Sequence, residues 1–406
     1  MNKIKVTRVE QHIIRKTNPI WKTIDDYCLR SKNLYNETNY IIRQQFIKTG
    51  KWDKFYDLCK SIKFLDCYKN IGSNVGQSTI KMVCEVWKSF AVASKDYNNN
   101  PSKYLGRPNL PKYKDKENGR YVLALDSNKV KLRDGYVHFC WKPFKNYIIS
   151  TQLKNVRLIQ LRFIPNKSHY TAEIVYEINV IDQKESSNKI CGIDIGVDNL
   201  ATVVNNTGLK SFVINGKVIK SYNQYYNKKL AKYESILKKT NNKNWSNRLQ
   251  RLTEKRFYKI KDYMHKASKY IVSWCVNNDI DTIVIGNNIK WKQNSNMGNT
   301  MNQTFVQIPY KMLIDQIVYK AENNGIKTII TEESYTSGTS FIDDEEPTKT
   351  NYNNKRRIHR GLFKSNTGVF INADINGAYQ IIKKVFPKAF ADGIQGVSLH
   401  PVRVLL

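Results

Sequence analysis

The sequence predicts a multidomain α+β protein, and three observations support this class. The chain has 406 residues, enough for two or three domains at roughly 150 residues each. Hydrophobic residues make up 41% of it, so the domains can bury separate cores. The spacing of those residues changes twice, from a helical period to a two-residue alternation and then to strands interrupted by helices. A single small module is therefore excluded.

The N-terminal part begins with an alternating segment at 3–11, which predicts one strand. Residues 22–96 have helical spacing and contain no proline, as in the apolar positions Val83, Trp87 and Phe90. This block predicts helices. It ends in the segment 97–120, where Asn, Pro and Gly cluster with Lys and Arg, and we expect a basic connector there.

The central part, Tyr121 to Ile178, alternates with a period of two. Short apolar runs such as YVLALD and YTAEIVYEI are separated by turn residues, including Asp134-Gly135. A series of short strands of this kind predicts a small barrel or sandwich, to which 3–11 would contribute a strand.

The C-terminal part, after 188, changes pattern again. Three strands in succession are followed by a long helical pair, and then a strand, a helix, a strand, a loop of about forty residues and a last helix alternate. This is the element order of the RNase H fold. We expect the strands at 189–197, 200–206, 211–216, 282–287 and 327–332, and the helices at 217–239, 246–277, 308–324 and from Asp374.

The charge of the chain points to a polyanionic partner. Sixty-seven Lys and Arg residues against 34 Asp and Glu residues give a formal net charge of +33. Solubility alone needs roughly 2–8 charges in a small domain, so nucleic acid is the expected partner. An anionic membrane surface is the weaker alternative. The apolar runs are too short to span a membrane and the N-terminus is polar, so we expect a soluble, unsecreted protein without membrane partners.

The cysteines and histidines do not form metal-binding patterns. Seven cysteines are spread from Cys28 to Cys275 without a closely spaced pair, and the six histidines are scattered. Neither a disulfide framework nor a structural zinc site is therefore expected.

Two aspartates stand where an RNase H-like fold could use them. Asp194 lies inside the apolar strand GIDIGV, where a buried charge is costly unless it is paired or binds a metal, and Gly192 and Gly196 would leave room for a phosphate backbone. Asp374 opens the last helix. The simpler alternatives are a lysine partner for Asp194 and a helix cap for Asp374. In this fold such carboxylates hold two Mg²⁺ ions, which activate a water for phosphodiester hydrolysis.

The segments GIDIGVDNLATVVNN, IVIGNNIKWKQ, TEESYTSG and INADINGAYQI resemble the RuvC-type nuclease half of TnpB proteins, which are transposon-encoded and related to type V CRISPR effectors. The resemblance is strong over 188–400 and loose before it. It implies an RNA-guided DNA endonuclease with a wedge-type β-barrel at 1–20 and 105–182 and a helical recognition lobe at 21–104. It also implies a RuvC domain at 188–406, with a helical insertion at 217–277 and a basic loop at 338–370.

Two departures from the family pattern matter. The usual glutamate after the fourth strand is replaced by Gly286, and the resemblance to variant relatives indicates Glu333 as the displaced ligand. We therefore expect Asp194, Glu333 and Asp374 to be the catalytic residues and to bind two Mg²⁺ ions, with Glu332 pointing away. The second departure is a cysteine-free segment in the place of the family's zinc finger.

Basic residues near these motifs are candidates for nucleic-acid binding, with a solvated loop and, for Trp291, burial in a core as the alternatives. We expect guide RNA and target DNA as partners, a monomer, and a location in the bacterial cytoplasm at the nucleoid. An RNA-guided repressor that has lost cleavage, suggested by Gly286, and an RNA-independent transposase are the rival functions. The candidate binding residues are Arg107, Lys112, Lys114, Lys290, Trp291, Lys292, Lys355, Arg356, Arg357 and Arg360.

Overall fold

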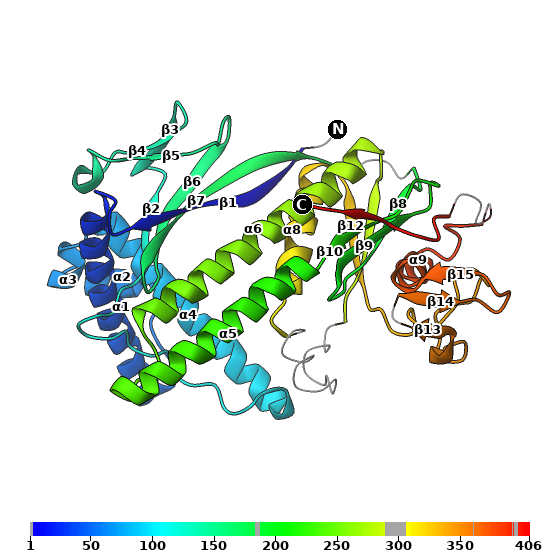
Figure 1. Cartoon of the computed structure of the whole chain (residues 1–406). Helices are drawn as coiled ribbons and strands as arrows, with labels where there is room; N and C mark the ends of the chain where they lie inside the picture. Colours follow the sequence, from blue (N-terminus) through cyan, green and yellow to red (C-terminus); the bar gives the residue numbers. More distant parts are fainter. Residues whose placement is uncertain (1–2, 183–186, 289–305, 360, 392, 394–396) are drawn as a thin grey trace. The chain divides into compact units, whose positions relative to one another are not determined.

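The computed structural model describes residues 3–182, 187–288, 306–359, 361–391, 393 and 397–406. The chain divides into two compact units, which are coloured along the sequence in Figure 1. The N-terminal unit is Lys5–Asn179, and the C-terminal unit is Val180–Leu406 with the first residues of the chain. Among the described residues, no helix combines the length and the apolar character needed to cross a lipid bilayer.

The helices of the N-terminal unit form where the sequence predicts them. In α4, Trp87 is fully buried and its Nε1 donates a hydrogen bond to Oδ1 of Asn39 in α1, at 2.9 Å. A buried indole needs such a partner, so this bond contributes to the packing of α1 against α4 beside their shared apolar core. The helices are α1 (Trp21–Thr49), α2 (Phe55–Ile62), α3 (Asp66–Lys69) and α4 (Ser73–Asn99).

The strands of the N-terminal unit form two sheets over one core. Rings of Phe139, Phe144 and Phe163 stack between them, with centroids 5.3 Å and 6.0 Å apart along the series. One sheet has the order β1-β7-β6-β2, and the other β3-β4-β5. The barrel assigned from the family resemblance remains a prediction. The strands are β1 (Lys3–Arg15), β2 (Leu123–Asp126), β3 (Val130–Arg133), β4 (Tyr136–Phe139), β5 (Ile148–Ser150), β6 (Arg157–Pro165) and β7 (His169–Ile181).

The C-terminal unit is built on a mixed sheet of order β12-β11-β8-β9-β10-β16. Strand β8 pairs antiparallel with β9, which pairs antiparallel with β10, whereas β11 and β12 extend the sheet parallel to β8. This arrangement is that of an RNase H-like sheet, with β16 added at one edge. The strands are β8 (Ile190–Asp194), β9 (Asn199–Asn205), β10 (Phe212–Asn215), β11 (Thr282–Gly286), β12 (Lys327–Thr331) and β16 (Val402–Val404).

Helices cover both faces of this sheet (Figure 1). Cys191 and Ile193 of β8 pack with α6 (Asn247–Asn277) and α8 (Tyr310–Asn323), which lie on one face beside α5 (Lys217–Asn241). Ile190 of β8 packs with α9 (Ala373–Val385) on the other face. Since alternate residues of a strand share a face, Gly192 and Asp194 belong to the α9 side.

Gly192 serves helix packing rather than the approach of a phosphate backbone, which corrects the expectation from the sequence. A Cβ at this position would stand 2.5 Å from Cγ1 of Ile382 and 2.7 Å from the carbonyl oxygen of Ala378, both in α9. The absence of a side chain therefore allows α9 to cross β8 closely, and this crossing brings the start of the helix to the end of the strand.

Replacing Gly192 with alanine should lower the free energy of unfolding by about 1–3 kcal/mol, because the clashing Ala378 carbonyl belongs to a helix backbone that cannot swing aside. Urea denaturation of the purified protein measures this. Gly106→Ala is the matched control, since nothing lies within 4 Å of a Cβ there. Equal stabilities of the two variants would contradict the close crossing.

The segment between β12 and α9, expected to be one long loop, contains a small antiparallel sheet. Its strands β13 (Arg357–His359), β14 (Leu362–Lys364) and β15 (Phe370–Asn372) are three residues long, too short to leave a pattern in the sequence. The side chains of Phe341 and Phe363 in this segment are buried and join the core beneath α9. The segment is therefore held by apolar contacts with this shared core as well as by polar contacts.

Candidate functional site

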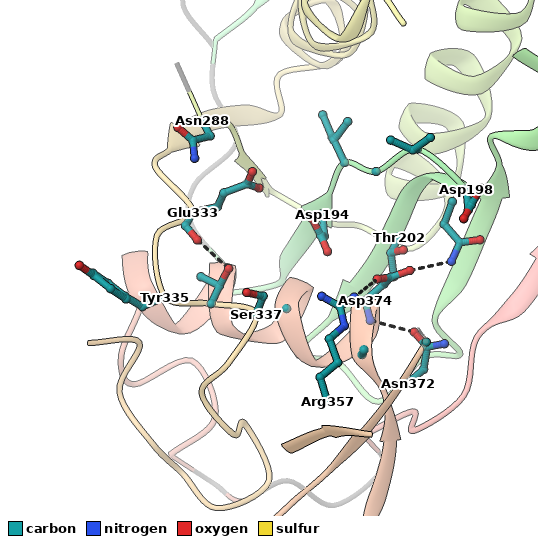
Figure 2. Close-up of a pocket in the computed structure, with 18 of the residues that line it drawn as sticks. Asp194, Asp198, Thr202, Asn288, Glu333, Tyr335, Ser337, Arg357, Asn372 and Asp374 are labelled. Carbon is teal, nitrogen blue, oxygen red and sulfur yellow. Dashed lines mark hydrogen bonds and ion pairs between the residues drawn. The ribbon is translucent and has the colours of Figure 1, made fainter. Parts of the chain in front are cut away.

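A pocket of about 800 Å³ lies where β8 ends and α9 begins (Figure 2). Asp194 comes from the end of β8, Asp374 from the first turn of α9, and Glu333 from the segment after β12. The three predicted carboxylates thus line the same pocket, and Arg357 of β13 lines it with them.

The pKa of Asp194 is raised well above its usual value, mainly by burial and then by the negative charges of Glu333 and Asp374, while Arg357 opposes the rise. Although protein surrounds the residue, it keeps some exposed surface, as expected on a pocket wall. Gly377 of α9 makes room for it, since a Cβ there would stand 3.2 Å from Oδ2 of Asp194. The site concentrates negative charge that is costly to bury.

Asp374 does not cap its helix, so the capping alternative is wrong. The cap is Asn372, whose Oδ1 accepts hydrogen bonds from the backbone N–H groups of Asp374 at 3.0 Å and Ile375 at 3.1 Å. The Asp374 carboxylate instead faces the pocket. Its Oδ2 accepts a 2.8 Å hydrogen bond from Asn199, and its Oδ1 lies 3.2 Å from the Arg357 guanidinium.

Glu333 and Glu332 are neighbours in sequence but lie in different surroundings. The side chain of Glu332 is half exposed and forms an ion pair with Lys384 at 3.2 Å. Glu333 lines the pocket, and its pKa is raised to about 7 by burial and then by Glu332, against the effect of Lys384. Its Oε2 stands only 2.9 Å from the position that a Cβ of residue 286 would occupy. The space that a side chain at Gly286 would need is thus shared by Glu333 and by Ile381, whose Cδ1 lies 2.5 Å from the same position.

As they stand in the described residues, no three His, Cys, Asp or Glu side chains form a group that could hold a metal ion. Asp374 is engaged by Asn199 and Arg357, which use both of its carboxylate oxygens. The donor set nevertheless fits a hard cation, because three carboxylates from separate elements face one pocket and burial disfavours the charge of Asp194 and Glu333.

The candidate binding residues lie in several places. Arg107, Lys112 and Lys114 belong to the N-terminal unit, where all three are exposed. Lys355 is exposed next to Arg356. Four candidates, Lys290, Trp291, Lys292 and Arg360, lie outside the described residues.

Arg356 is placed differently from the expectation. Its side chain is 10% exposed and pairs with Glu345 at 2.8 Å, so its guanidinium is engaged inside the protein rather than presented to a nucleic acid. The basic run around it had not indicated this, because the acidic partner lies eleven residues earlier in the sequence.

Asn199 is a site residue that the sequence did not reveal. Together with Asp198 it reads as a turn between two strands, and that interpretation hides its hydrogen bond to Asp374. The one signal available was its place five residues after Asp194, at the start of the neighbouring strand. Asp198 itself pairs with Lys220 at 2.6 Å.

Comparisons with known proteins agree with the sequence motifs. The OrfB_IS605 family model, described as a probable transposase, matches residues 173–292, and a model described as the Cas12f1-like TNB domain matches 310–381. The TnpB-like protein ORF457 of Acidianus two-tailed virus is 24% identical over 388 residues, covering 87% of this chain and 81% of the relative.

Two solved structures are also similar. A Cas12f1–sgRNA–target DNA complex matches with a TM-score of 0.36 and 17% identity, covering 93% of this chain and 98% of the other. The mini-RNA-guided endonuclease CRISPR-Cas_phi3 matches with a TM-score of 0.47 and 10% identity, covering 98% and 94%. The family models and the curated relative confirm the resemblance of this chain to TnpB proteins that its motifs indicated.

Proposed function

We propose that this protein is an RNA-guided DNA endonuclease of the TnpB family that hydrolyses a DNA phosphodiester with divalent cations held by Asp194, Glu333 and Asp374. The observation that carries the proposal is the position of Glu333. Its carboxylate oxygen Oε2 lies 2.9 Å from the position that a Cβ of residue 286 would occupy beside β11, where the family pattern has its second acid. This placement removes the reason for preferring a repressor, since the pocket keeps three acids despite Gly286.

Mg²⁺ is the cation that these ligands suit, because it prefers oxygen donors. Two bound Mg²⁺ ions would activate a water and stabilise the leaving oxygen of the phosphodiester. The three carboxylates would supply the negative charge that binds these ions, and the ions would in turn stabilise the charge of Asp194, whose pKa is raised by burial and then by its acidic neighbours. No zinc is needed in this account.

Other residues of the pocket orient the ligands. Asn199 donates to one oxygen of Asp374 and Arg357 pairs with the other, so the carboxylate has a fixed orientation before any cation binds. Asn372 caps α9 and leaves the Asp374 side chain free for this role. Fixed ligands hold the reacting groups in place, which is a main source of rate enhancement.

The partners would be a guide RNA and the target DNA that pairs with it. In the proposed division of labour the N-terminal unit, with its wedge and recognition lobe, reads a short motif next to the target, while basic side chains contact phosphates. Arg107, Lys112 and Lys114 would do so in that unit and Lys355 in the C-terminal unit, whereas Arg357 pairs with Asp374. We further propose that the protein acts at the nucleoid of a bacterial cell, where it would meet target DNA.

The protein should co-purify with RNA, and its affinity for nucleic acid should fall steeply with salt, because a net charge of +33 provides many phosphate contacts. Each neutralised phosphate adds about 0.9 to the slope of log affinity against log salt on duplex DNA. Filter binding between low and moderate salt measures the slope. A slope near zero would contradict the proposal that the basic side chains bind nucleic-acid phosphates.

Gly286→Ala should lower the rate of target cleavage by about 10- to 100-fold while changing the melting temperature little. The added Cβ would meet Oε2 of Glu333 at 2.9 Å and Cδ1 of Ile381 at 2.5 Å, and both are tips of side chains that can move aside. The fold therefore tolerates the change, but the carboxylate is displaced. The cleavage rate is measured at saturating Mg²⁺, and the melting temperature is measured by thermal denaturation. An unchanged cleavage rate would contradict the placement of Glu333.

The proposed function itself is tested by incubating the purified protein, with its co-purified RNA, with DNA that contains the matching target. Cleavage that requires both the RNA and Mg²⁺ is expected, and it should stop when EDTA removes the cation. Failure to cut any target in the presence of both would reject the proposal.

A further inference from the structure

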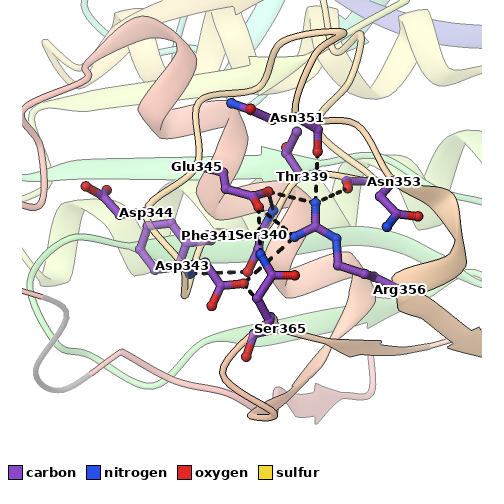
Figure 3. A network of polar contacts seen from close by, with 12 residues as sticks. Thr339, Ser340, Phe341, Asp343, Asp344, Glu345, Asn351, Asn353, Arg356 and Ser365 are labelled. Atoms are coloured by element: carbon purple, nitrogen blue, oxygen red, sulfur yellow. Dashed lines mark hydrogen bonds and ion pairs between the residues drawn. The ribbon is translucent and has the colours of Figure 1, made fainter.

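Arg356 stands at the centre of a polar network that joins distant parts of the segment before α9 (Figure 3). Its two terminal nitrogens each lie 2.8 Å from an oxygen of Glu345, in a two-pronged ion pair. The guanidinium also donates to the carbonyl oxygens of Asn351 at 2.8 Å and Gly338 at 3.2 Å. A planar guanidinium with this many fixed partners holds three stretches of chain together.

The same segment is attached on its other side to α9. Three polar residues on one stripe of the helix, Asn376, Gln380 and Lys383, are nearly fully buried. Asn376 donates to the carbonyl oxygen of Thr339 and accepts from the amide of Phe341, at 2.8 Å and 2.9 Å. Gln380 donates to the carbonyl oxygen of Glu345 at 3.0 Å, and Lys383 contacts Asp344. Among the described residues Oε1 of Gln380 has no hydrogen-bond partner, but the other bonds of this stripe favour one arrangement of the chain.

The ion pair is maintained despite its burial. Burial works against the negative charge of Glu345, yet hydrogen bonds from Arg356 and from the Ser340 amide outweigh it, and the pKa of Glu345 is lowered. Asp343 lies 3.8 Å from the guanidinium and accepts hydrogen bonds from the backbone of Asn366 and Thr367. Arg356 is thus connected to Gly338 directly and to Asn366 and Thr367 through Asp343.

The residue after Arg356 is Arg357, which pairs with Asp374 in the pocket. The two neighbouring guanidinium groups have opposite surroundings, since one is buried among Glu345 and backbone carbonyls and the other lines the pocket. Because the two residues are consecutive, a fixed position of Arg356 restricts the positions that the Arg357 side chain can reach.

We propose that Arg356 is a positioning residue for the pocket: its bonds to Glu345, Gly338 and Asn351 cross-link the segment 338–351 to β13 and hold Arg357 against Asp374. This rests on the proposed function of the pocket. The cross-link lies in the stretch where the family pattern has a zinc finger. In this chain the hydrogen bonds and ion pair of Arg356 connect the parts of that stretch. It acts on the reaction through Arg357 and Asp374 and does not touch substrate.

The test compares Arg356→Met, Arg356→Lys, Arg357→Met and the double variant Arg356→Met/Arg357→Met in the full chain with its co-purified RNA. Lys349→Met is the control, because it removes an exposed charge from the same segment. Three quantities are measured: hydrogen exchange by mass spectrometry, the affinity for target DNA, and the rate of cleavage at saturating target.

Arg356→Met should speed exchange within 338–359 and the first turn of α9, leave exchange in α6 unchanged, and keep the target affinity within about twofold. Its cleavage rate should fall about tenfold, and the double variant should cut about as fast as Arg357→Met alone, since the two residues act in series. Arg356→Lys should not restore the rate, because lysine lacks the fork. Lys349→Met should behave as the unmodified protein.

The inference would be overturned if the fold-loss in cleavage rate of the double variant equalled the product of the losses of the two single variants. Full cleavage activity of Arg356→Lys would also overturn it. If the unmodified protein does not cleave at all, the proposed function fails, and the exchange data then decide the inference alone. Faster exchange confined to 338–359 and the start of α9 would support it, and unchanged exchange there would overturn it.

Discussion

Glu333→Gln is expected to abolish Mg²⁺-dependent cleavage, with a loss of at least about 100-fold. Residues that only orient a metal ligand typically cost 10- to 100-fold when mutated, so removing a ligand should cost at least as much. Glutamine keeps the size of the side chain and fills the space beside Gly286, but it removes the negative charge. Guided binding of target DNA should remain, because Glu333 lies in the pocket and provides no positive charge for phosphates. Cleavage and gel-shift assays on one preparation measure both.

Glu332→Gln is the matched control for this prediction. It makes the same chemical change one residue earlier, where the side chain is half exposed and pairs with Lys384 outside the pocket. Most activity should survive. If the Glu332 variant fails and the Glu333 variant cuts normally, the two residues have been assigned in the wrong order.

Asp194→Asn should also abolish cleavage, and it should make the metal-free protein more stable by about 1 kcal/mol. The pKa of Asp194 is raised by burial and by two neighbouring acids, which means that its charge is unfavourable in the folded state. Asparagine has nearly the same shape without that charge. Thermal melting in EDTA measures the stability, and Mg²⁺-dependent cleavage measures the activity.

Asp281→Asn is the matched control for the predicted effect of Asp194→Asn on stability. Asp281 is 4% exposed, but its carboxylate accepts hydrogen bonds from the hydroxyls of Ser187 at 2.8 Å and Thr282 at 2.6 Å. Removing its charge weakens these bonds, so this variant should lose about 1–2 kcal/mol. A loss of stability in both variants would contradict the view that the Asp194 charge is unfavourable.

The regular elements of the C-terminal unit could be predicted because their patterns are long. Strand β8 alternates between two helical layers, and α6 has an apolar stripe over many turns. Strands β13 to β15 and β16 are three residues long and form only where the rest of the fold brings their partners close. Nothing in so short a stretch distinguishes a strand from a loop.

The candidate site could be predicted in part. Asp194 is a clear candidate because it is a charged residue inside an apolar strand. Asp374 becomes a candidate only in combination with Asp194, since alone it could be a helix cap. The hydrogen bond from Asn199 and the pairing of Arg356 with Glu345 depend on how loops fold back. Charge alone made Arg356 and Arg357 look equivalent, whereas the fold buries one and turns the other to the pocket.

The most direct test of the central claim is the cleavage of target DNA by the purified protein, measured in Mg²⁺ with and without its co-purified RNA. Cutting is expected only when both RNA and Mg²⁺ are present, and Glu333→Gln should not cut at all. Cutting that persists after the RNA is removed would indicate an RNA-independent nuclease. Tight guided binding by the unmodified protein without any cutting would contradict the account and leave a repressor in its place.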